Sequence, residues 1–138
     1  MEYPLRVLIV DDHEAVRIGV RAILSTRPDI EVCGEAANGQ EALDKAKELS
    51  PDVIIMDITM PVVDGFTAAR EMSKVAPGAS VLLLSMHESP NLLNVAKSSG
   101  ARGYIAKSEG SAAILRALDA LAHHRTFFPD SQQSAVAH

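Results

Sequence analysis

Five polar residues that could do chemistry stand at the ends of short apolar segments. Asp11 and Asp12 follow one such segment, Asp57 follows a second, and Ser85 and Lys107 end two more. Three carboxylates held close together repel one another unless a cation lies between them. Mg²⁺ is usually held by one or two carboxylates together with water and phosphate oxygens. The residue types therefore indicate a Mg²⁺ site with a hydroxyl and a lysine beside it, provided that the fold brings the four segment ends together.

Alternating strands and helices are predicted along most of the chain. Runs rich in Val, Ile and Leu alternate five times with Ala-rich stretches whose apolar residues recur at helical spacing. This alternation predicts an α/β fold, with helices on both faces of a parallel sheet. In such sheets ligands bind beyond the carboxyl ends of the strands, where the four segment ends should meet. The predicted strands are residues 5–10, 30–36, 52–56, 80–85 and 102–107, and the predicted helices are residues 14–26, 40–49, 65–75, 90–99 and 110–123.

Each of these polar residues also has a purely structural role open to it. Asp11 or Asp12 could cap the helix that follows, since Asp is favoured at a helix N-terminus. Asp57 is a poorer cap because the next predicted helix begins eight residues later, at Gly65, and Asp64 is better placed for that role. The hydroxyl and the lysine alone would be ordinary surface groups. Beside three carboxylates, each of them favours a binding role instead.

The composition is typical of one soluble globular domain. The chain has 138 residues, of which 47% are hydrophobic and 22% are charged. The net charge of −5 argues against nucleic-acid binding by this chain, because phosphate binding needs a basic surface. The sequence has no apolar run near the roughly 20 residues that span a bilayer, and no signal peptide is predicted at its start.

The histidines and the cysteine are predicted to have no metal-binding role. His13, His87, His123 and His124 share no helical or strand face with the acids at a metal-like spacing. Cys33 is the only cysteine, so the chain can form no intrachain disulfide, and a reducing, cytoplasmic setting is expected. We interpret Cys33 as a small buried hydrophobic residue.

Four motifs resemble those of a known family. The segments "VDD" (10–12), "DITMPVVDG" (57–65), "LLLS" (82–85) and "YIAKS" (104–108) resemble the receiver domain of two-component response regulators. The following "KSEG" and the Ala/Leu-rich last helix are most similar to the NarL/FixJ (LuxR-type) subgroup. The resemblance implies a flavodoxin-like (CheY-like), doubly wound five-stranded parallel sheet with strand order 2-1-3-4-5.

The resemblance also implies a role for each residue of the predicted site. Asp57 is then the phosphoacceptor, which takes a phosphoryl group from a sensor histidine kinase. Asp12 and Asp57 would bind Mg²⁺ directly, Asp11 would bind it through water, and the backbone carbonyl of Thr59 would be a further ligand. Lys107 would add a second positive charge, as phosphoryl transfer requires positioning and charge neutralisation.

Other residues would carry the signal away from the phosphoryl group. By resemblance, Ser85 would donate a hydrogen bond to a phosphoryl oxygen, and Tyr104 would turn inward. The surface of the fourth helix, fifth strand and fifth helix would then change. The side chains of Thr59 and His87 would tune the lifetime of the phosphorylated state.

Two features depart from the family pattern. Val62 and Val63 stand where many receivers have Gly and Met, and two β-branched residues stiffen that loop. Ser108 follows Lys107 where most receivers have proline, so the geometry of that peptide bond stays open.

The expected organisation is a receiver domain over residues 1–124 and a linker or tail over residues 125–138, with no DNA-binding domain in this chain. A longer parent protein would control transcription through a helix-turn-helix domain, and phosphorylation could drive a homodimer. The leading alternative is a stand-alone receiver that acts by binding other proteins.

Three other readings remain open at this point. A haloacid-dehalogenase-like phosphatase would need a second acid where the chain has Thr59. A small flavin- or nucleotide-binding module would need phosphate-binding groups after the first strand, where acids stand instead. A degenerate receiver would not need the full set of acids.

Overall fold

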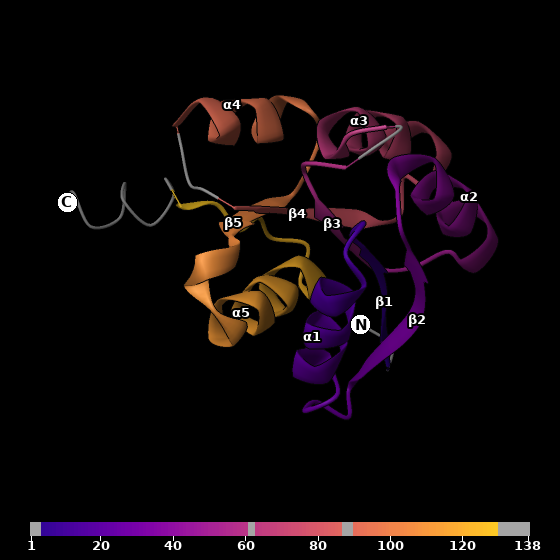
Figure 1. The fold of residues 1–138 in the computed structure, drawn as a ribbon, viewed down its shortest axis with the longest axis vertical. Helices are drawn as coiled ribbons and strands as arrows, with labels where there is room; N and C mark the ends of the chain where they lie inside the picture. The colour runs from indigo at the N-terminus through magenta and orange to yellow at the C-terminus, as the bar shows by residue number, and fades with distance from the viewer. Residues whose placement is uncertain (1–3, 61–62, 87–89, 130–138) are drawn as a thin grey trace.

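The structure is a computed structural model that describes residues 4–60, 63–86 and 90–129. Strands and helices alternate along this part of the chain (Figure 1). The strands are β1 (Leu5–Val10), β2 (Ile30–Ala36), β3 (Val53–Asp57), β4 (Ser80–Ser85) and β5 (Gly103–Ala106). The helices are α1 (Glu14–Leu24), α2 (Gly39–Leu49), α3 (Gly65–Val75), α4 (Pro90–Ser98) and α5 (Ser111–Ala122), with a short 3₁₀ helix at Lys107–Glu109.

The five strands form one parallel sheet in the order β2-β1-β3-β4-β5. This order confirms the predicted doubly wound fold. Helices α1 and α5 cover one face of the sheet, and α2, α3 and α4 cover the other (Figure 1). The strand order reverses at β1, because β2 lies on one side of β1 and β3 lies on the other. The carboxyl ends of β1 and β3 are therefore neighbours, at the point where such folds bind ligands.

Two separate hydrophobic cores lie on the two faces of the sheet. Each strand contributes side chains to both cores, because successive side chains point to opposite faces. In β1, Leu5, Val7 and Ile9 face α1 and α5, whereas Leu8 and Val10 face the other three helices. The core residues are mostly Val, Ile, Leu, Ala and Met, as the low aromatic content implies.

The helix that follows β3 is capped by Asp64, as predicted. The Asp64 carboxylate accepts a hydrogen bond from the Thr67 N–H at 2.8 Å. Asn38 caps α2 in the same way, accepting from the Glu41 N–H at 2.8 Å. Asp64 therefore has a structural role, and Asp57 needs a different explanation.

The last strand is shorter than predicted, and the segment after α5 is more ordered. Strand β5 ends at Ala106, so Lys107 already belongs to the 3₁₀ helix. The N–H of Tyr104 donates to the carbonyl of Phe127 at 3.0 Å, and Phe128 is buried in the core beside α4. Phe127 and Phe128 lie within the predicted linker or tail (125–138), and both make contacts with the rest of the described chain. Residues 130–138 lie outside the described residues.

Candidate functional site

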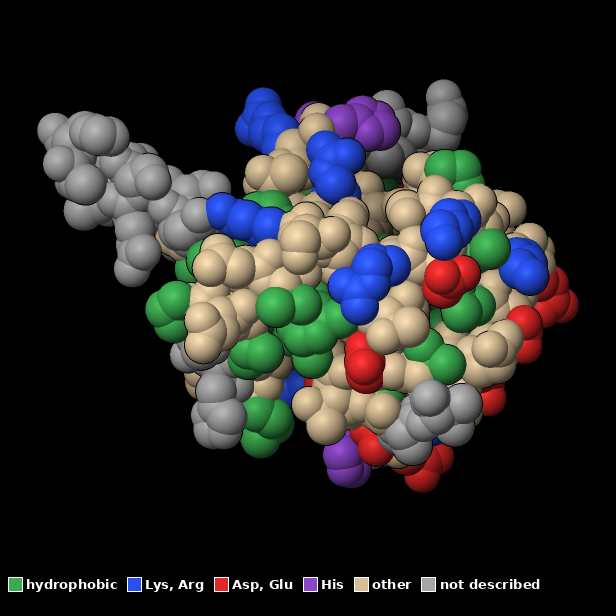
Figure 2. All heavy atoms as spheres, turned by 90° about the horizontal axis from the view of Figure 1, so that it is seen from above, with side chains coloured by type: hydrophobic (Ala, Val, Ile, Leu, Met, Phe, Trp, Pro, Cys, Tyr) green, Lys and Arg blue, Asp and Glu red, His purple; other side chains and the backbone are tan. Residues whose placement is uncertain are grey.

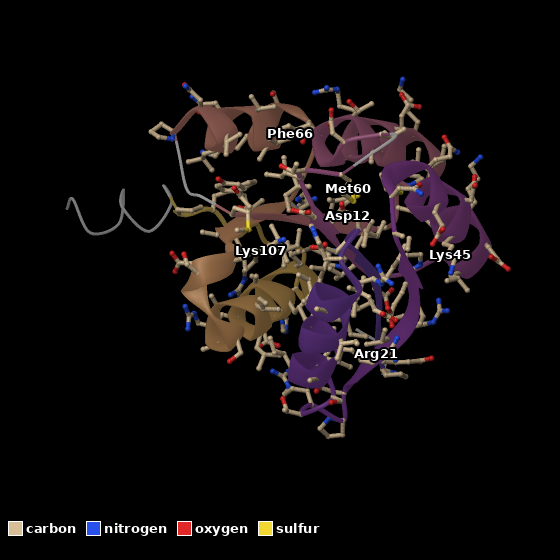
Figure 3. All side chains as sticks on the ribbon, in the orientation of Figure 1. Asp12, Arg21, Lys45, Met60, Phe66 and Lys107 are labelled. Carbon is tan, nitrogen blue, oxygen red and sulfur yellow. The ribbon has the colours of Figure 1, made fainter. Side chains whose placement is uncertain are left out.

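The predicted site residues meet at the carboxyl edge of the sheet. Val10 and Met56 are paired across β1 and β3, so Asp11 and Asp57 follow at the same level. Lys107 reaches the same edge from the end of β5. The labels of Asp12, Met60 and Lys107 in Figure 3 mark three chain segments that meet there.

Asp11, Asp12 and Asp57 form a compact acidic cluster. One ligand atom from each of them, and one from His13, all lie within 4.8 Å of one another. Asp11 and Asp57 are only 2% and 4% exposed. The Oδ1 atom of Asp12 is buried and accepts no hydrogen bond from any described residue. Buried carboxylate oxygens this close together are strongly repulsive without a cation, so the site has a physical need for one.

The donor set fits Mg²⁺. Ligands on opposite sides of this ion, each at about 2.1 Å, stand about 4.2 Å apart. The separations within the cluster, all below 4.8 Å, are of this size. Asp11, Asp12 and Asp57 supply the hard oxygen atoms that Mg²⁺ prefers over nitrogen.

Lys107 lies between two of the acids. Its Nζ donates to Asp11 Oδ2 at 3.1 Å and lies 3.4 Å from Asp57 Oδ1. The lysine side chain is 20% exposed, so most of its stem is covered while the ammonium group faces the acids. The predicted convergence of Lys107 with the acids is present in the structure.

Asp57 has an unfavourable environment for its charge. Burial raises the pKa of its carboxyl group above the usual value, and the nearby charge of Asp11 raises that pKa further. The positive charge and hydrogen bond of Lys107, and the backbone N–H of Thr59, act in the opposite direction. A carboxylate that binds a proton or another positively charged group more readily than usual is typical of a functional site.

The main chain around Asp57 is fixed from both sides. The N–H of Ile58 donates to the Leu84 carbonyl at 3.0 Å, and the N–H of Gly65 donates to the Ile58 carbonyl at 2.8 Å. A side chain at Gly65 would lie against the carbonyl of Asp57 and only 2.7 Å from the Ile58 Cα atom. Glycine is therefore required where α3 begins, because the helix starts in contact with the Asp57 backbone.

The other predicted residues occupy different positions around the cluster. Ser85 ends β4 and is 4% exposed, one residue beyond the partner of Asp57 in that strand. Thr59 is exposed in the loop after β3. Tyr104 is fully buried and shares a core with Phe128. His87 and Val62 lie outside the described residues.

His13 lies beside the acids, a contact that its spacing in the sequence did not predict. Its Nδ1 lies 3.3 Å from Asp11 Oδ1 and 3.1 Å from Asp12 Oδ1. The prediction considered helical and strand spacing, whereas His13 follows the two acids directly in the chain. That direct adjacency was the available signal.

Arg17 on α1 was also missed. Its Nη1 donates to the backbone carbonyl of Asp11 at 2.7 Å. The position of Arg17 one turn into α1 would have indicated only an exposed charge, so the sequence held no clear signal for this contact.

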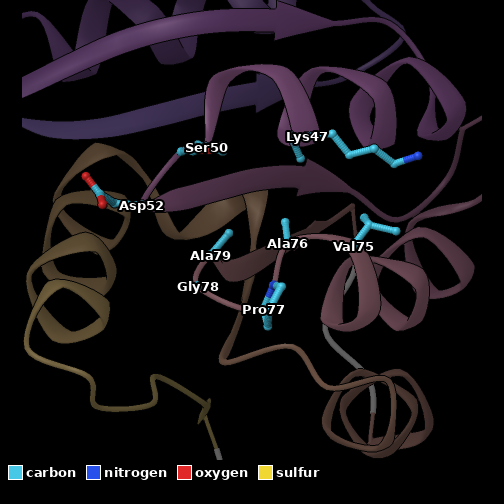
Figure 4. Close-up of a pocket in the computed structure, with 10 residues that line it drawn as sticks. Lys47, Ser50, Asp52, Val75, Ala76, Pro77, Gly78 and Ala79 are labelled. Atoms are coloured by element: carbon cyan, nitrogen blue, oxygen red, sulfur yellow. The ribbon is translucent and has the colours of Figure 1, made fainter.

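A separate cavity of about 370 Å³ lies at the opposite edge of the sheet (Figure 4). It is lined by the C-terminal ends of α2 and α3 and by the segments that lead into β3 and β4. Its one carboxylate, Asp52, accepts a hydrogen bond from the Arg6 N–H at 2.9 Å, which is a structural role. This cavity holds no cluster of acids like that at the carboxyl edge.

Comparison with known proteins gives consistent results. A family model described as "Response regulator receiver domain" matches residues 7–119. The response regulator protein VraR of Staphylococcus saprophyticus is 42% identical over 115 residues, which cover 83% of this chain and 55% of VraR. The chain therefore spans about half the length of the curated relatives that it matches.

Solved structures agree in fold. The signal receiver domain of NarL from Mycobacterium tuberculosis has a TM-score of 0.83 at 34% identity, covering 88% of this chain and 98% of that one. A LuxR-family response regulator from Aurantimonas sp. SI85-9A1 has a TM-score of 0.87 at 35% identity, covering 93% and 92%.

The matched region begins in β1 and ends in α5, so it contains most of β1, the other four strands and all of the clustered acids. The chain belongs to the response regulator receiver domain family and is a receiver domain of a two-component response regulator, most like the NarL and LuxR type.

Proposed function

We propose that Asp57 is the phosphoacceptor of this receiver domain. The observation that carries the proposal is the position of its carboxylate, buried at the carboxyl edge among Asp11, Asp12 and Lys107. Asp64, the neighbouring acid, is occupied as a helix cap. Asp57 caps none of the helices whose N-caps are described, and burial raises the free energy of its charged form.

The phosphoryl donor is a sensor histidine kinase, since receiver domains generally act with such kinases. In the proposed step, an Asp57 carboxylate oxygen attacks the phosphorus of a phosphohistidine. The new P–O bond forms as the P–N bond breaks, and the electrons of that bond return to the imidazole nitrogen. Phosphoryl transfer of this kind depends mainly on positioning and charge neutralisation.

The surrounding residues supply both requirements. Asp12 and Asp57 would hold Mg²⁺ directly, with Asp11 through water and Thr59 through its carbonyl. When bound, Mg²⁺ neutralises negative charge where the phosphoryl group arrives. Lys107, already 3.1 Å from Asp11 and 3.4 Å from Asp57, provides a second positive charge that stays with the protein.

Ser85 and Tyr104 are proposed to carry the signal outward. A phosphoryl group adds negative charge and strong acceptor oxygens, and the Ser85 hydroxyl would donate to one of them. Tyr104 is fully buried in this structure, and its side chain is proposed to respond to that hydrogen bond. The surface formed by α4, β5 and α5 is proposed to change when Asp57 is phosphorylated. Thr59 and His87 are proposed to tune how long the phosphoryl group persists.

Output is proposed to lie in a longer parent protein. The first relatives are about twice as long as the matched segment, which leaves room for a helix-turn-helix domain. The described basic side chains on the face in Figure 2 are spread among acidic and hydrophobic ones, and the net charge is −5. We therefore assign DNA binding to that separate domain. We propose that the receiver domain forms a homodimer when it is phosphorylated.

The domain is proposed to be a signalling domain rather than an enzyme with a substrate of its own. None of the helices in the described part of the chain has both the length and the apolar composition that crossing a lipid bilayer requires. We propose a cytoplasmic location, which is consistent with a chain whose single cysteine can form no intrachain disulfide.

The test is labelling with acetyl phosphate in the presence of Mg²⁺, followed by intact mass spectrometry. The wild-type chain should gain one phosphoryl group, and Asp57→Asn should gain none while it keeps its circular dichroism spectrum. Asp64→Asn is the matched control, because Asn also caps helices and this variant should be labelled normally. Labelling that persists in Asp57→Asn would overturn the site assignment.

A further inference from the structure

Arg17 connects the acidic cluster to the edge strand of the sheet. Its guanidinium group donates through Nη1 to the Asp11 carbonyl at 2.7 Å and through Nε to Glu35 Oε1 at 2.9 Å. The Arg17 and Glu35 side chains are only 17% and 20% exposed. A planar guanidinium group can hold two partners in fixed directions at once, which a lysine cannot do.

The partner on β2 is itself well anchored. Glu35 lies opposite Ile9 in the register of β1 and β2, and it also forms an ion pair with Arg21. The next residue, Ala36, accepts a hydrogen bond from the Asp11 N–H at 3.1 Å. Both peptide groups that flank Asp11 are therefore held by β2, one directly and the other through Arg17 and Glu35.

The held carbonyl matters because it belongs to the peptide unit that joins Asp11 to Asp12. A peptide unit is planar, so fixing its carbonyl also fixes the direction in which the chain enters Asp12. The Oδ1 atom of Asp12 accepts no hydrogen bond from a described residue, so no such bond orients that oxygen. His13 Nδ1 lies 3.1 Å from this oxygen, and the direction of the main chain through Asp12 is the other feature that orients it.

We propose that Arg17 is a positioning residue for the metal-binding acids, and that Glu35 holds Arg17 in place. The inference rests on the proposed function, because it concerns the affinity of the same cluster for Mg²⁺. Arg17 touches neither the ion nor the phosphoryl group. It acts by holding the Asp11–Asp12 peptide so that both carboxylates face Asp57.

Charge and position predict opposite effects for Arg17. A positive side chain close to a cation site repels the cation, so its removal would strengthen Mg²⁺ binding if charge were its only contribution. If Arg17 positions the acids, its removal weakens Mg²⁺ binding in spite of that lost repulsion. Removing a partner that orients metal ligands typically lowers metal affinity about 10- to 100-fold.

The experiment titrates Mg²⁺ into the unphosphorylated 138-residue chain by isothermal calorimetry. Arg17→Met should raise the Kd for Mg²⁺ about tenfold or more. Arg17→Lys should give a smaller increase, because it can reach only one of the two partners. Arg21→Met is the matched control, since Arg21 also pairs with Glu35 but does not contact Asp11, and it should bind Mg²⁺ at least as tightly as wild type.

A second readout separates positioning from general damage. The Mg²⁺ concentration that gives half-maximal labelling by acetyl phosphate should rise in Arg17→Met, while labelling at saturating Mg²⁺ stays near the wild-type level. Loss of folding would lower both, and in that case Arg17→Lys carries the comparison. Unchanged or tighter Mg²⁺ binding in a folded Arg17 variant would overturn the positioning role alone. A wild-type chain that neither binds Mg²⁺ nor is labelled would overturn the proposed function itself.

Discussion

The ammonium nitrogen of Lys107 lies 3.1 Å from a carboxylate oxygen of Asp11, although 96 positions separate the two residues in the chain. The same nitrogen lies 3.4 Å from Asp57 Oδ1. One side chain thus offsets part of the repulsion between two buried acids that follow neighbouring strands. The protein carries part of the positive charge that its site needs before any metal ion is bound.

The first prediction concerns this internal cation. Lys107→Met should lower the free energy of unfolding in EDTA by about 1 to 3 kcal/mol, because it leaves two buried carboxylates without their charged partner. Added Mg²⁺ should recover more stability in this variant than in wild type, since the ion takes over the missing charge. Urea unfolding with and without Mg²⁺ measures both effects.

Lys74→Met is the control for the lysine variant. Lys74 forms an exposed pair with Glu71 at 3.5 Å, and such surface pairs contribute little. Equal unfolding curves for the two lysine variants in EDTA would contradict the role of Lys107 between the acids.

The second prediction concerns pH. The pKa of Asp57 is higher in the folded protein than in the unfolded chain, where 3.8 is the usual value. The folded state therefore binds this proton more tightly, and the stability from protonated Asp57 is fully present below the unfolded pKa and lost as pH rises through the folded pKa. At neutral pH the charge of Asp57 opposes folding.

Asp57→Asn should therefore be more stable than wild type at neutral pH in EDTA, and this advantage should shrink as the pH falls toward 4. Urea unfolding across that pH range is the measurement, with Glu48→Gln as an exposed acid for comparison. An advantage that is absent at neutral pH, or that grows in acid, would be inconsistent with the raised pKa.

The fold could be predicted from sequence because its signals are local. The alternation of apolar runs with Ala-rich helical stretches is repeated five times, and Asp64 is one residue from the helix that it caps. The strand order itself came from the family resemblance. The acids and Lys107 were predictable because parallel strands end at one edge.

His13 and Arg17 could not be predicted in the same way. Their contacts depend on the turn after β1 and on a side chain reaching from α1 to Glu35 on β2, and neither distance follows from periodicity. Phe127 and Phe128 follow the last helix without any repeat. The pairing of Phe127 with β5 and the packing of Phe128 in the core are therefore tertiary contacts without a local signal.

The third prediction uses two glycines. Gly65→Ala should destabilise the domain by about 1 to 3 kcal/mol, because the added methyl group meets the backbone of Asp57 and Ile58. The displaced Asp57 should also be labelled more slowly by acetyl phosphate. Gly19→Ala, on an exposed part of α1 with no atom within 4 Å of the new methyl group, should stabilise by up to about 1 kcal/mol. The same response from both variants would contradict this account.

The fourth prediction concerns the segment after α5. Phe128 is 7% exposed and packs in the core that contains Tyr104, with Lys97 over its ring at 5.3 Å. Phe128→Ala should cost about 2 to 4 kcal/mol in unfolding experiments. Removing only residues 130–138, the last part of the predicted linker or tail (125–138), should leave stability unchanged. Equal destabilisation by this truncation and by Phe128→Ala would contradict the packing role of Phe128.

Mapping the modified residue shows whether Asp57 receives the phosphoryl group. The chain would be labelled with acetyl phosphate and Mg²⁺, reduced with borohydride to convert an aspartyl phosphate into homoserine, and digested for tandem mass spectrometry. We expect homoserine at position 57 and intact aspartate at positions 11, 12 and 64. Homoserine at any of those three positions, with Asp57 unchanged, would contradict it.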